Sequence, residues 1–548
     1  MSTRRSRDGC REFAAFVVPQ RRGECADAQV CSRKLASRNV RPGEGRMKLT
    51  ETLTEPVRAH RELEHLDVLI VGAGISGIGA AHHLHEQCPE KNFVVLESKP
   101  NFGGTWQTHR YPGARSDSDL YTYGYRFKPW TGAPIATKDE ILKYMSEVIM
   151  DEDLDRHIRY EHQVTSASWS SAEKRWSLNV TRSDTGEQMQ LTATFLWMCQ
   201  GYYRHSVGHT PNWVGMDQFA GPIIHPQSWP DDLEYVDKDV VVIGSGATAA
   251  TLIPAMAQEC RHVTMLQRSP TYFFIRSNVN EVADMLRELD IPEEWVHEIV
   301  RQKILLDFAA ITKLALEFPE LAREELLKPI REILGDDYDI ETHFNPKYKP
   351  WQQRIAMVPD GDLFEAIKRG KVSVVTDEID SFTKTGIKLK SGATLDADVV
   401  ITATGFDMSV LGDIAFSIDG RVLDLSQTIT YRGLMFTDVP NLLQVFGYFR
   451  ASWTLRVDLI GDFSCRLFNY MESHGVDVVT PRLRSEDADM TLLAWVNPED
   501  FNPGYMNRSV HLFPKQGSRD PWRNGLTYEL EKETLPAADF EDGSLLFT

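Results

Sequence analysis

Runs of consecutive apolar residues, each followed by a glycine-rich turn, are the clearest feature of the hydrophobic pattern. The first run occupies residues 68–71, directly after Asp67, and is followed by glycines and then by apolar residues at helical spacing over 78–84. A second run, 240–243, directly after Asp239, precedes a turn of the same kind. Uninterrupted apolar runs are typical of strands that a parallel sheet buries on both faces. The pattern therefore predicts an α/β protein with two doubly wound sheets.

Four further stretches have patterns of their own. Residues 165–197 contain short alternating runs, which predict a β-meander inserted into the first domain. The aromatic residues between 121 and 127 alternate and predict a strand, and residues 397–405 predict a buried strand that returns to the first domain. Residues 289–335 predict several amphipathic helices with these core positions: Trp295, Ile299, Ile304, Leu305 and Phe308.

The first glycine turn has the features of a dinucleotide site. Gly72 permits a tight turn, Gly74 lets the backbone approach a pyrophosphate, and Gly77 lets the helix pack close to the strand. The phosphates would lie on free N–H groups at the start of the helix. Glu97 ends the next apolar run, where a carboxylate accepts both ribose hydroxyls and repels a 2′-phosphate. The turn predicts a Rossmann-like site for FAD or NAD, the alternative being a glycine-rich turn in another kind of α/β domain.

The second glycine turn differs from the first in the residues that follow it. Gly244, Gly246 and Ala249 repeat the turn, but the next strand ends in Gln267 and Arg268 instead of an acid. Glutamine does not repel a 2′-phosphate, and arginine binds one through charge-assisted, forked hydrogen bonds. The second site therefore suits NADP. Two different dinucleotides on one chain predict a flavin enzyme that a nicotinamide reduces.

These patterns divide the chain into six parts. Residues 1–46 carry eleven Lys or Arg against five acids. An organellar transit peptide would have this bias, but the acids and Pro19 spoil a targeting helix, so we favour a disordered extension or sequence upstream of a start at Met47. The other parts are a first FAD-binding segment at 60–215, a linker at 216–238, an NADP-binding domain at 239–380 with a helical insertion at about 289–335, a second FAD-binding segment at 381–475, and a tail at 476–548.

Composition excludes several other classes. The net charge of −19 argues against a general nucleic-acid binder, because phosphate backbones require a basic surface. Seven scattered cysteines without a CxxC pair indicate neither a disulfide framework nor a metal site, and they favour a reducing, cytoplasmic setting. No apolar run reaches the roughly 18 residues of a transmembrane helix. Peripheral membrane contact and the oligomeric state are left open.

Candidate site residues also lie in stretches without regular periodicity. Residues 103–117 combine glycines, a proline and aromatics, which suits a loop beside a planar ring, and we expect Asp117 to be buried and paired there. His225 lies in a proline-rich linker, where it could simply be a packed histidine. Arg354 lies in a loop, where a lone arginine is usually exposed. The residues alone assign no role to either.

Together these motifs resemble the flavin-dependent Baeyer–Villiger monooxygenases of the single-chain type that uses FAD and NADPH. Residues 219–230 match the signature F-x-G-x-x-x-H-x-x-x-W-P of that family at each position. Residues 103–117 match its second signature, G-G-x-W-x-x-x-x-Y-P-G-x-x-x-D. The similarity extends from about residue 66 to about residue 522 and is closest to the ethionamide-activating branch of mycobacterial enzymes.

The resemblance implies roles for three residues. Arg354 matches the arginine that sits over the flavin and stabilises a negatively charged oxygen species, and Asp117 matches the acid that holds it. His225 matches the linker histidine that couples the domains. Gln353 stands where many relatives have a lysine that binds the 2′-phosphate, so the preference for NADPH depends mainly on Arg268. The expected cofactor-binding residues are Gly72, Gly74, Ser76, Gly77, Glu97, Gly104, Thr105, Trp106, Arg115, Ser116, Asp117, Val164, Gly244, Ser245, Gly246, Ala247, Thr248, Ala249, Arg268, Ser269 and Gly405.

The implied reaction is that of an NADPH-dependent flavin monooxygenase. NADPH reduces FAD, and O₂ supplies an oxygen atom that is inserted next to a ketone carbonyl to give an ester or lactone, with sulfoxidation of thioethers as a side activity. A heteroatom oxygenase and a long-chain hydrocarbon oxygenase on the same scaffold are the alternatives. The missing CxxC pair argues against a disulfide reductase. The intact arginine and acid argue against a flavin-binding regulator without turnover.

Overall fold

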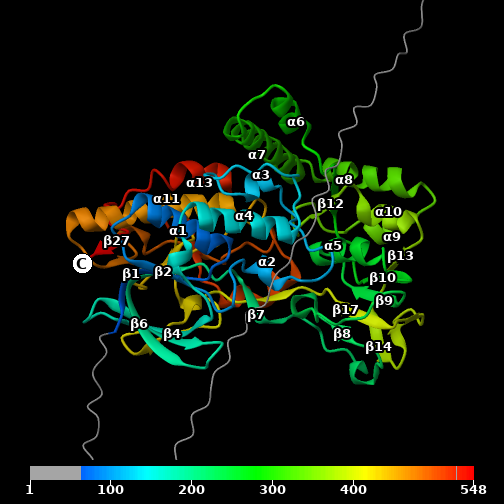
Figure 1. Cartoon of the computed structure of the whole chain (residues 1–548), viewed down its shortest axis with the longest axis horizontal. Coiled ribbons are helices and arrows are strands. Elements are labelled where there is room, and N and C mark those ends of the chain that lie inside the picture. Colours follow the sequence, from blue (N-terminus) through cyan, green and yellow to red (C-terminus); the bar gives the residue numbers. More distant parts are fainter. Residues whose placement is uncertain (1–62, 526) are drawn as a thin grey trace, which may run out of the picture. The chain divides into compact units, whose positions relative to one another are not determined.

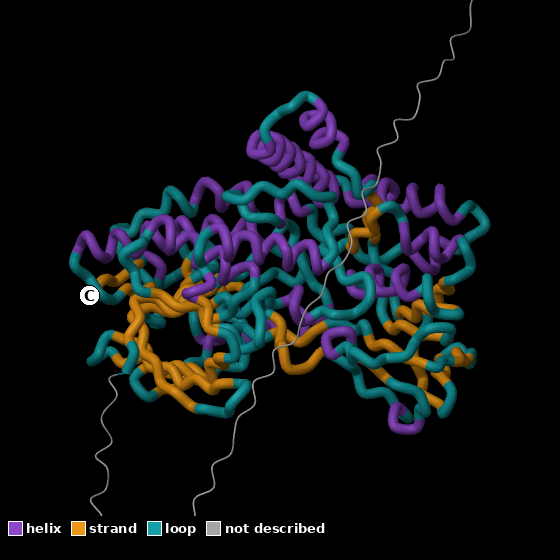
Figure 2. Tube along the Cα trace, in the orientation of Figure 1, coloured by secondary structure: helices purple, strands orange, loops and turns teal. Residues whose placement is uncertain are grey.

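A computed structural model describes residues 63–525 and 527–548 of the chain. The predicted basic extension, residues 1–46, lies outside the described residues. These described residues belong to one compact unit, Glu62–Thr548, of which residues 62 and 526 are not described. Within it, the strands gather in two main groups, and most helices lie along one side of them (Figures 1 and 2).

The first group of strands is a nine-stranded sheet in the order β20-β19-β4-β5-β6-β1-β2-β3, with β23 also pairing with β6. Its centre is β1 (His65–Val71), which is parallel to β2 (Phe93–Leu96) and joined to it by α1 (Ile75–Gln87). The predicted β-meander is confirmed, because three long strands pair antiparallel in this sheet: β4 (His162–Ser170), β5 (Arg175–Arg182) and β6 (Gln188–Met198). The short strands are β3 (Ile158–Arg159), β19 (Ala415–Ile418), β20 (Arg421–Val422) and β23 (Leu442–Gln444).

The second group is a parallel five-stranded sheet in the order β13-β10-β9-β17-β8. The strands are β13 (Val372–Thr376), β10 (His262–Gln267), β9 (Asp239–Ile243), β17 (Val399–Thr402) and β8 (Ile223–Ile224). A glycine turn connects β9 to α5 (Ala247–Met256), and α10 (Asp362–Lys368) precedes β13. Two doubly wound units of this kind confirm the predicted fold class.

The strand predicted at 397–405 is in this second sheet, so its assignment to the first domain is wrong. Every residue of β17 is buried, and β17 pairs with β9 through Val400 and Val241. A fully apolar strand finds two buried faces beside β9, where it completes the parallel sheet. After β17 the chain forms β18 (Phe406–Met408), which pairs with β7 (Tyr203–Gly208). It returns to the first sheet only at the next strand, β19. The other predicted domain boundaries stay predictions.

The aromatic stretch at 121–127 is not the predicted strand. It begins as the one-turn helix α3 (Leu120–Tyr123), because the Asp119 carboxylate accepts a hydrogen bond from the Tyr121 N–H and caps the helix. Tyr121 and Tyr125 are both fully buried. The Tyr125 hydroxyl donates to the carbonyl oxygen of Ile75 at 2.6 Å and so ties this segment to α1.

The helices predicted over about 289–335 are confirmed as α7 (Glu293–Glu317) and α8 (Pro319–Leu334), and α6 (Glu281–Glu288) precedes the predicted range. Of the predicted core positions, Ile304 is buried, and Leu305 and Phe308 are half-buried. Trp295 and Ile299 were wrongly placed in the core: they are 63% and 43% exposed. The buried stripe of α7 runs through Val296, Val300 and Ile304, one position away from Trp295 and Ile299, and α6 and α7 project from the other elements in Figure 1.

The tail is tied to the core by a buried ion pair. Arg456 on α11 (Thr454–His474) donates to Glu531 on α13 (Tyr528–Thr534) at 2.7 Å, and Tyr448 donates to the same carboxylate at 2.6 Å. Arg456 and Glu531 are 1% and 3% exposed. The tail also contains α12 (Gly504–Ser509). Across 63–525 and 527–548, we find no helix whose length and apolarity would let it cross a membrane.

Candidate functional site

The first glycine turn joins β1 to α1 with its backbone packed tightly on neighbouring segments. Gly72 has a φ of +101°, and a Cβ there would lie 2.9 Å from the carbonyl oxygen of Cys199. A Cβ on Gly77 would lie 1.8 Å from the Gly72 oxygen, which leaves room for no side chain. No side chain caps the start of α1, so its first N–H groups remain available to phosphate oxygens. The turn thus fits a dinucleotide.

Glu97 lies directly beside this turn, at the end of β2. The Ala73 N–H donates to its Oε2 at 2.8 Å, and the Lys99 N–H donates to its Oε1 at 2.9 Å. Glu97 is 6% exposed and lines a cavity of about 630 Å³. Both backbone donors orient the carboxylate toward the turn, in the position from which it can accept ribose hydroxyls.

The 630 Å³ cavity collects most of the predicted cofactor-binding residues. It is bordered by the first glycine turn and by the loop that contains α2 (Thr105–Thr108), and Val164 of β4 also lines it. Gly104 approaches the turn so closely that a Cβ on it would lie 3.0 Å from the Cα of Gly74. From the second domain, Ala247 and Thr248 at the start of α5 reach the same cavity. The neighbourhoods of both nucleotide turns therefore meet in one space.

Flat aromatic side chains form one wall of this cavity. Trp106 donates through its indole nitrogen to the Tyr123 hydroxyl at 3.0 Å. Tyr202 stacks on Trp453 with ring centroids 5.0 Å apart, and Trp453 donates to Ser76 Oγ at 2.8 Å. These contacts fix the ring planes. A preformed wall of this kind fits the planar ring system of a flavin.

The second glycine turn repeats the geometry of the first. Gly244 has a φ of +122°, and a Cβ there would lie 2.3 Å from the carbonyl oxygen of Ala403. The N-terminus of α5 has no side-chain cap, and a Cβ on Gly246 would meet only open space. Ala249 is fully buried against the sheet, and Ser245 contacts Thr271 through their hydroxyls at 3.0 Å. An open helix start of this kind fits a second dinucleotide.

At the end of β10, Gln267 and Arg268 point to different environments. Gln267 is 1% exposed and donates to the carbonyl oxygen of His343 at 2.7 Å and to Thr376 at 2.9 Å. The Gln267 side chain thus points into the domain interior. A neutral side chain suits this buried position, and it does not face a bound 2′-phosphate. Arg268 and Ser269 are exposed at the strand end. Lys390 and, less strongly, Arg268 lower the pKa of Glu378, which places that carboxylate near Arg268.

Arg354 and Asp117 are 237 residues apart in the sequence and form a forked ion pair. Arg354 Nε donates to Asp117 Oδ2 at 2.7 Å, and Nη2 donates to Oδ1 at 2.8 Å. The Asp117 carboxylate is the main reason that the pKa of the Arg354 guanidinium is raised, against the effect of burial. The charge on Arg354 is therefore permanent, and its plane is held by two hydrogen bonds.

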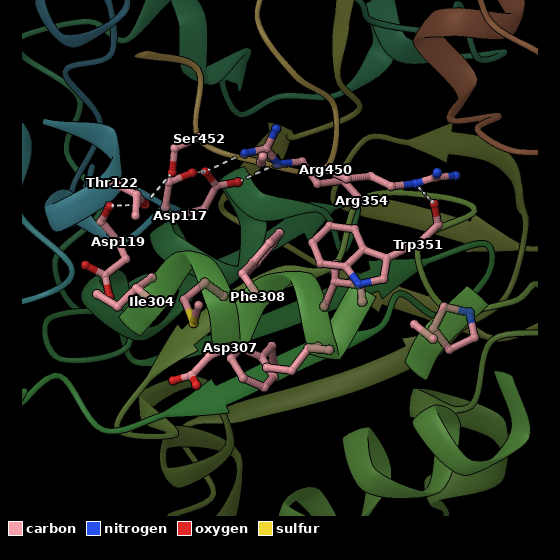
Figure 3. A pocket seen from close by; sticks show the side chains of 18 of the residues that line it. Asp117, Asp119, Thr122, Ile304, Asp307, Phe308, Trp351, Arg354, Arg450 and Ser452 are labelled. Atoms are coloured by element: carbon pink, nitrogen blue, oxygen red, sulfur yellow. Dashed lines mark hydrogen bonds and ion pairs between the residues drawn. The ribbon is translucent and has the colours of Figure 1, made fainter. Parts of the chain in front are cut away.

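This ion pair forms part of the wall between two cavities. Asp117 and Arg354 line the 630 Å³ cavity and also a second cavity of about 370 Å³ (Figure 3). The second cavity is mostly apolar and lies between the helical insertion and the loops near residues 351 and 450. Its apolar lining includes Ile304, Leu305, Phe308, Leu314, Trp351 and Phe449. A group of permanent charge thus faces both a cofactor-sized space and an apolar pocket.

Three tyrosines near Arg354 were not among the site residues predicted from the sequence. Tyr202 donates to the Tyr203 hydroxyl at 2.8 Å, and the ring of Tyr203 lies 5.9 Å from that of Tyr505 on α12. Tyr202 and Tyr505 both act on the pKa of Arg354. No motif marks Tyr505, because it belongs to a tail without a periodic pattern. The only signal was the two adjacent tyrosines after Gly201, at the end of the first segment.

His225 is not brought to the arginine: it lines neither cavity. Its Nδ1 accepts a hydrogen bond from the Gln227 N–H at 3.1 Å, and its Nε2 donates to the carbonyl oxygen of Gly405 at 3.0 Å. Burial lowers the pKa of His225, in agreement with this neutral pattern of one acceptor and one donor. The ring fills the space where a Cβ on Gly208 would be, 2.0 Å away. His225 therefore connects the linker to β7 and to the strand end at Gly405.

Arg115 and Ser116, two further predicted cofactor-binding residues, also have protein partners. Arg115 donates to both carboxylate oxygens of Asp362 on α10, at 2.6 and 3.1 Å. This pair joins the loop at 103–117 to the second domain. Ser116 exchanges hydrogen bonds with Ser118 and is 3% exposed. Both residues still line the 630 Å³ cavity.

The fold defines an α/β protein with two dinucleotide-type domains, and comparison with known proteins gives its enzyme class. Residues 70–131 match the family described as NAD(P)-binding Rossmann-like domain, and residues 133–304 match the family described as Flavin-binding monooxygenase-like. The chain is 46% identical over 486 residues to "FAD-containing monooxygenase EthA" of Mycobacterium tuberculosis, covering 88% of this chain and 98% of the relative. It is 43% identical over 487 residues to "Probable FAD-binding monooxygenase AlmA" of Acinetobacter baylyi, covering 88% and 96%.

Solved structures with low sequence identity share the fold. A steroid monooxygenase bound to NADP superposes with a TM-score of 0.69 at 23% identity and covers 88% of this chain and 99% of its own. Cyclohexanone monooxygenase from Rhodococcus sp. Phi1 bound to NADP⁺ superposes with a TM-score of 0.63 at 24% identity, covering 78% and 88%.

The chain belongs to the flavin-binding monooxygenase-like family. It is an oxidoreductase whose cofactors are FAD and NADP. The predicted resemblance, enzyme class and cofactors are thereby confirmed.

Proposed function

We propose that this enzyme catalyses a Baeyer–Villiger oxidation, in which NADPH and O₂ are used to convert a ketone to an ester or lactone. The observation that carries the proposal is the Arg354–Asp117 pair, which borders both the cofactor-sized cavity and the apolar cavity. FAD, when bound, accepts a hydride from NADPH and in its reduced form activates O₂. The protein side chains then have to bind the ketone, stabilise developing charge and exclude water.

Arg354 supplies the charge that this reaction needs. Oxygen transfer to a carbonyl develops negative charge on oxygen, and a fixed cation that is already in position stabilises such charge without reorganisation. Arginine does not lose its proton in proteins, so it cannot quench a nucleophilic oxygen by protonating it. Asp117 accepts hydrogen bonds from Nε and Nη2 and leaves Nη1 for the reacting groups. Asp117 is in this proposal a positioning residue.

The apolar cavity is the proposed substrate site. Its walls carry aliphatic and aromatic side chains from α7, α8 and the loops beside them. Such walls bind the hydrocarbon part of a ketone or of a thioether, and for this reason sulfoxidation is included as a second activity. The stacked pair of Tyr202 and Trp453 lines the adjoining 630 Å³ cavity.

The cofactor contacts follow from the same geometry. We assign FAD to the first glycine turn, Glu97, the loop at 103–117 and Val164, and NADP to the second turn with Arg268 and Ser269. His225 is assigned a positioning role, because it joins Gly405 to the linker through two hydrogen bonds and is not part of the lining of either cavity.

The proposal is tested with the purified holoenzyme. NADPH consumption is measured with linear, cyclic and aryl ketones, and the products are identified by mass spectrometry together with those from a thioether and an alkane. We expect ketone-stimulated consumption of NADPH and formation of one ester or lactone per NADPH. Sulfoxide or alcohol products without any ester from the ketones would replace the proposal with the heteroatom or hydrocarbon alternative.

A further inference from the structure

One carboxylate oxygen in the wall of the apolar cavity has no hydrogen-bond partner in the described part of the chain. Asp119 is 8% exposed and lines the cavity two residues after Asp117. Its Oδ1 accepts from the Tyr121 N–H at 3.0 Å, but its Oδ2 accepts no hydrogen bond. In Figure 3, the Asp119 side chain extends toward the Ile304 side of the cavity.

The helix cap does not explain this second oxygen. A cap on α3 needs one acceptor atom, and Ser or Asn would provide it as well as Asp does. A buried carboxylate is costly unless it is paired, and burial raises the pKa of Asp119 to about 6. Arg276 Nη1 lies 3.6 Å from Oδ2, too far for a hydrogen bond, so it compensates the charge only in part. The chain therefore keeps a buried acceptor in this cavity at a cost in stability.

The other carboxylates that line the cavity are engaged or exposed. Both oxygens of Asp117 accept from Arg354. Asp307 pairs with Lys303 at 2.6 Å on the surface of α7. Glu325 and Glu529 are exposed. Asp119 Oδ2 is thus the buried acceptor that these walls leave to a ligand.

We propose that Asp119 is a specificity-determining residue that accepts a hydrogen bond from a hydroxyl or N–H group of the substrate. The substrate class is then a ketone whose largely apolar body carries a hydrogen-bond donor away from the carbonyl. This inference rests on the proposed function, because it takes the apolar cavity as the substrate site and Arg354 as the group beside the carbonyl. A ketone without the donor leaves the buried oxygen unsatisfied and binds less well.

The magnitude follows from the nature of the bond. A hydrogen bond to a charged acceptor in a site from which water is excluded discriminates about 10–100-fold against a ligand that cannot form it. The partial compensation by Arg276 at 3.6 Å favours the lower end of this range. We therefore expect a preference of about tenfold for the donor-bearing ketone.

The test uses the holoenzyme and a set of linear ketones that carry a hydroxyl group at different carbons, each beside its unsubstituted parent. Binding to the oxidised enzyme without NADPH is measured from the perturbation of the flavin spectrum, and kcat/KM is measured from ester formation. At least one hydroxyketone should bind about tenfold more tightly than its parent to the wild type. No preference for any member of the set would overturn the proposal.

The decisive variant is Asp119→Asn. The Tyr121 N–H keeps the Asn oxygen as the cap acceptor, so an NH₂ group replaces Oδ2 and turns the acceptor into a donor. The preference should disappear in Asp119→Asn, and also in Asp119→Ser, which keeps the cap and removes the second oxygen. Asp424→Asn is the matched control, because Asp424 also caps a short helix, through the Ser426 N–H, and lines neither cavity.

The possible outcomes separate the two proposals. A wild-type preference that persists in both Asp119 variants would show that Asp119 does not read the donor. If no ketone yields an ester while the hydroxyketones still bind preferentially and Asp119→Asn abolishes that preference, the proposed reaction fails but the donor site stands.

Discussion

Replacing Arg354 with alanine should separate NADPH consumption from product formation. The side chain makes two hydrogen bonds to Asp117, at 2.7 and 2.8 Å, and belongs to neither glycine turn. Its loss removes a positioned charge beside both cavities and leaves the two dinucleotide sites intact. We therefore expect Arg354→Ala to purify with FAD and to accept reducing equivalents from NADPH.

The expected magnitude can be set from the geometry. Removing one preorganised charge or donor from an active site typically costs about 10²–10³ in rate. The side chains of Arg354 and Asp117 are 35% and 25% exposed, so the unpaired aspartate left behind can be hydrated. The loss of stability should therefore stay below the roughly 3–5 kcal/mol that breaking a fully buried pair costs. The effect should consequently appear in the yield of ester and not in folding.

The assay compares three quantities in the same reaction: NADPH consumed, hydrogen peroxide formed and ester formed. In Arg354→Ala, the rate of ester formation should fall about 10²–10³-fold, and hydrogen peroxide should account for nearly all NADPH. Asp117→Ala should fail in the same direction but less completely, since it removes the orienting partner and leaves the charge. Arg110→Ala is the matched control, because Arg110 lies in the same loop as Asp117, residues 103–117, and its ion pair with Asp231 is at the surface.

An ester yield per NADPH in Arg354→Ala equal to that of the wild type would refute this reasoning. Arg354 would then be a structural partner of Asp117. A variant without FAD would refute it in another way, by showing that the arginine is part of the flavin site itself.

Four further predictions address the cofactors and stability. Arg268→Ala should raise the KM for NADPH about tenfold with little change for NADH, and equal effects in steady-state kinetics would make Arg268 structural. Gly77→Ala should purify with substoichiometric FAD by absorbance, because its Cβ would lie 1.8 Å from the Gly72 oxygen. Glu531→Ala should lower the free energy of unfolding by about 3–5 kcal/mol in urea titrations, since it leaves buried Arg456 unpaired. Burial and, to a lesser extent, the charge of Arg301 lower the pKa of His297 from 6.5 to about 4, so the unfolded chain binds more protons than the folded chain between these pH values. The Tm should therefore fall as pH is lowered from 6.5 to 4, and it should fall less steeply in His297→Gln.

Much of the fold could be predicted because its signals are local. An apolar strand, a glycine turn and a helix follow one another within about twenty residues at both dinucleotide sites, and each part needs only its neighbours to be recognised. The errors arose where a local cap or a tertiary contact overrides the hydrophobic pattern. Asp119 caps a helix where alternating aromatics indicate a strand, and Trp295 is exposed although its helix pattern places it in a core. The sequence of β17 is that of a buried strand and fits either sheet, and only its pairing with β9 shows that it belongs to the second sheet.

The site illustrates the same limit more sharply. Asp117 and Arg354 are single polar residues in loops that are 237 residues apart in the sequence, and nothing in either loop indicates that the two side chains form a pair. Only the resemblance to a known family linked them. The apolar cavity could not be predicted at all, because its walls come from α7, α8 and two distant loops. Asp119 is the clearest case, since no sequence pattern marks it, and only the structure shows that its buried second oxygen accepts no hydrogen bond. The residues proposed to select a substrate are thus brought together by packing between segments, whereas those proposed to bind nucleotides are placed by the turn in which they occur.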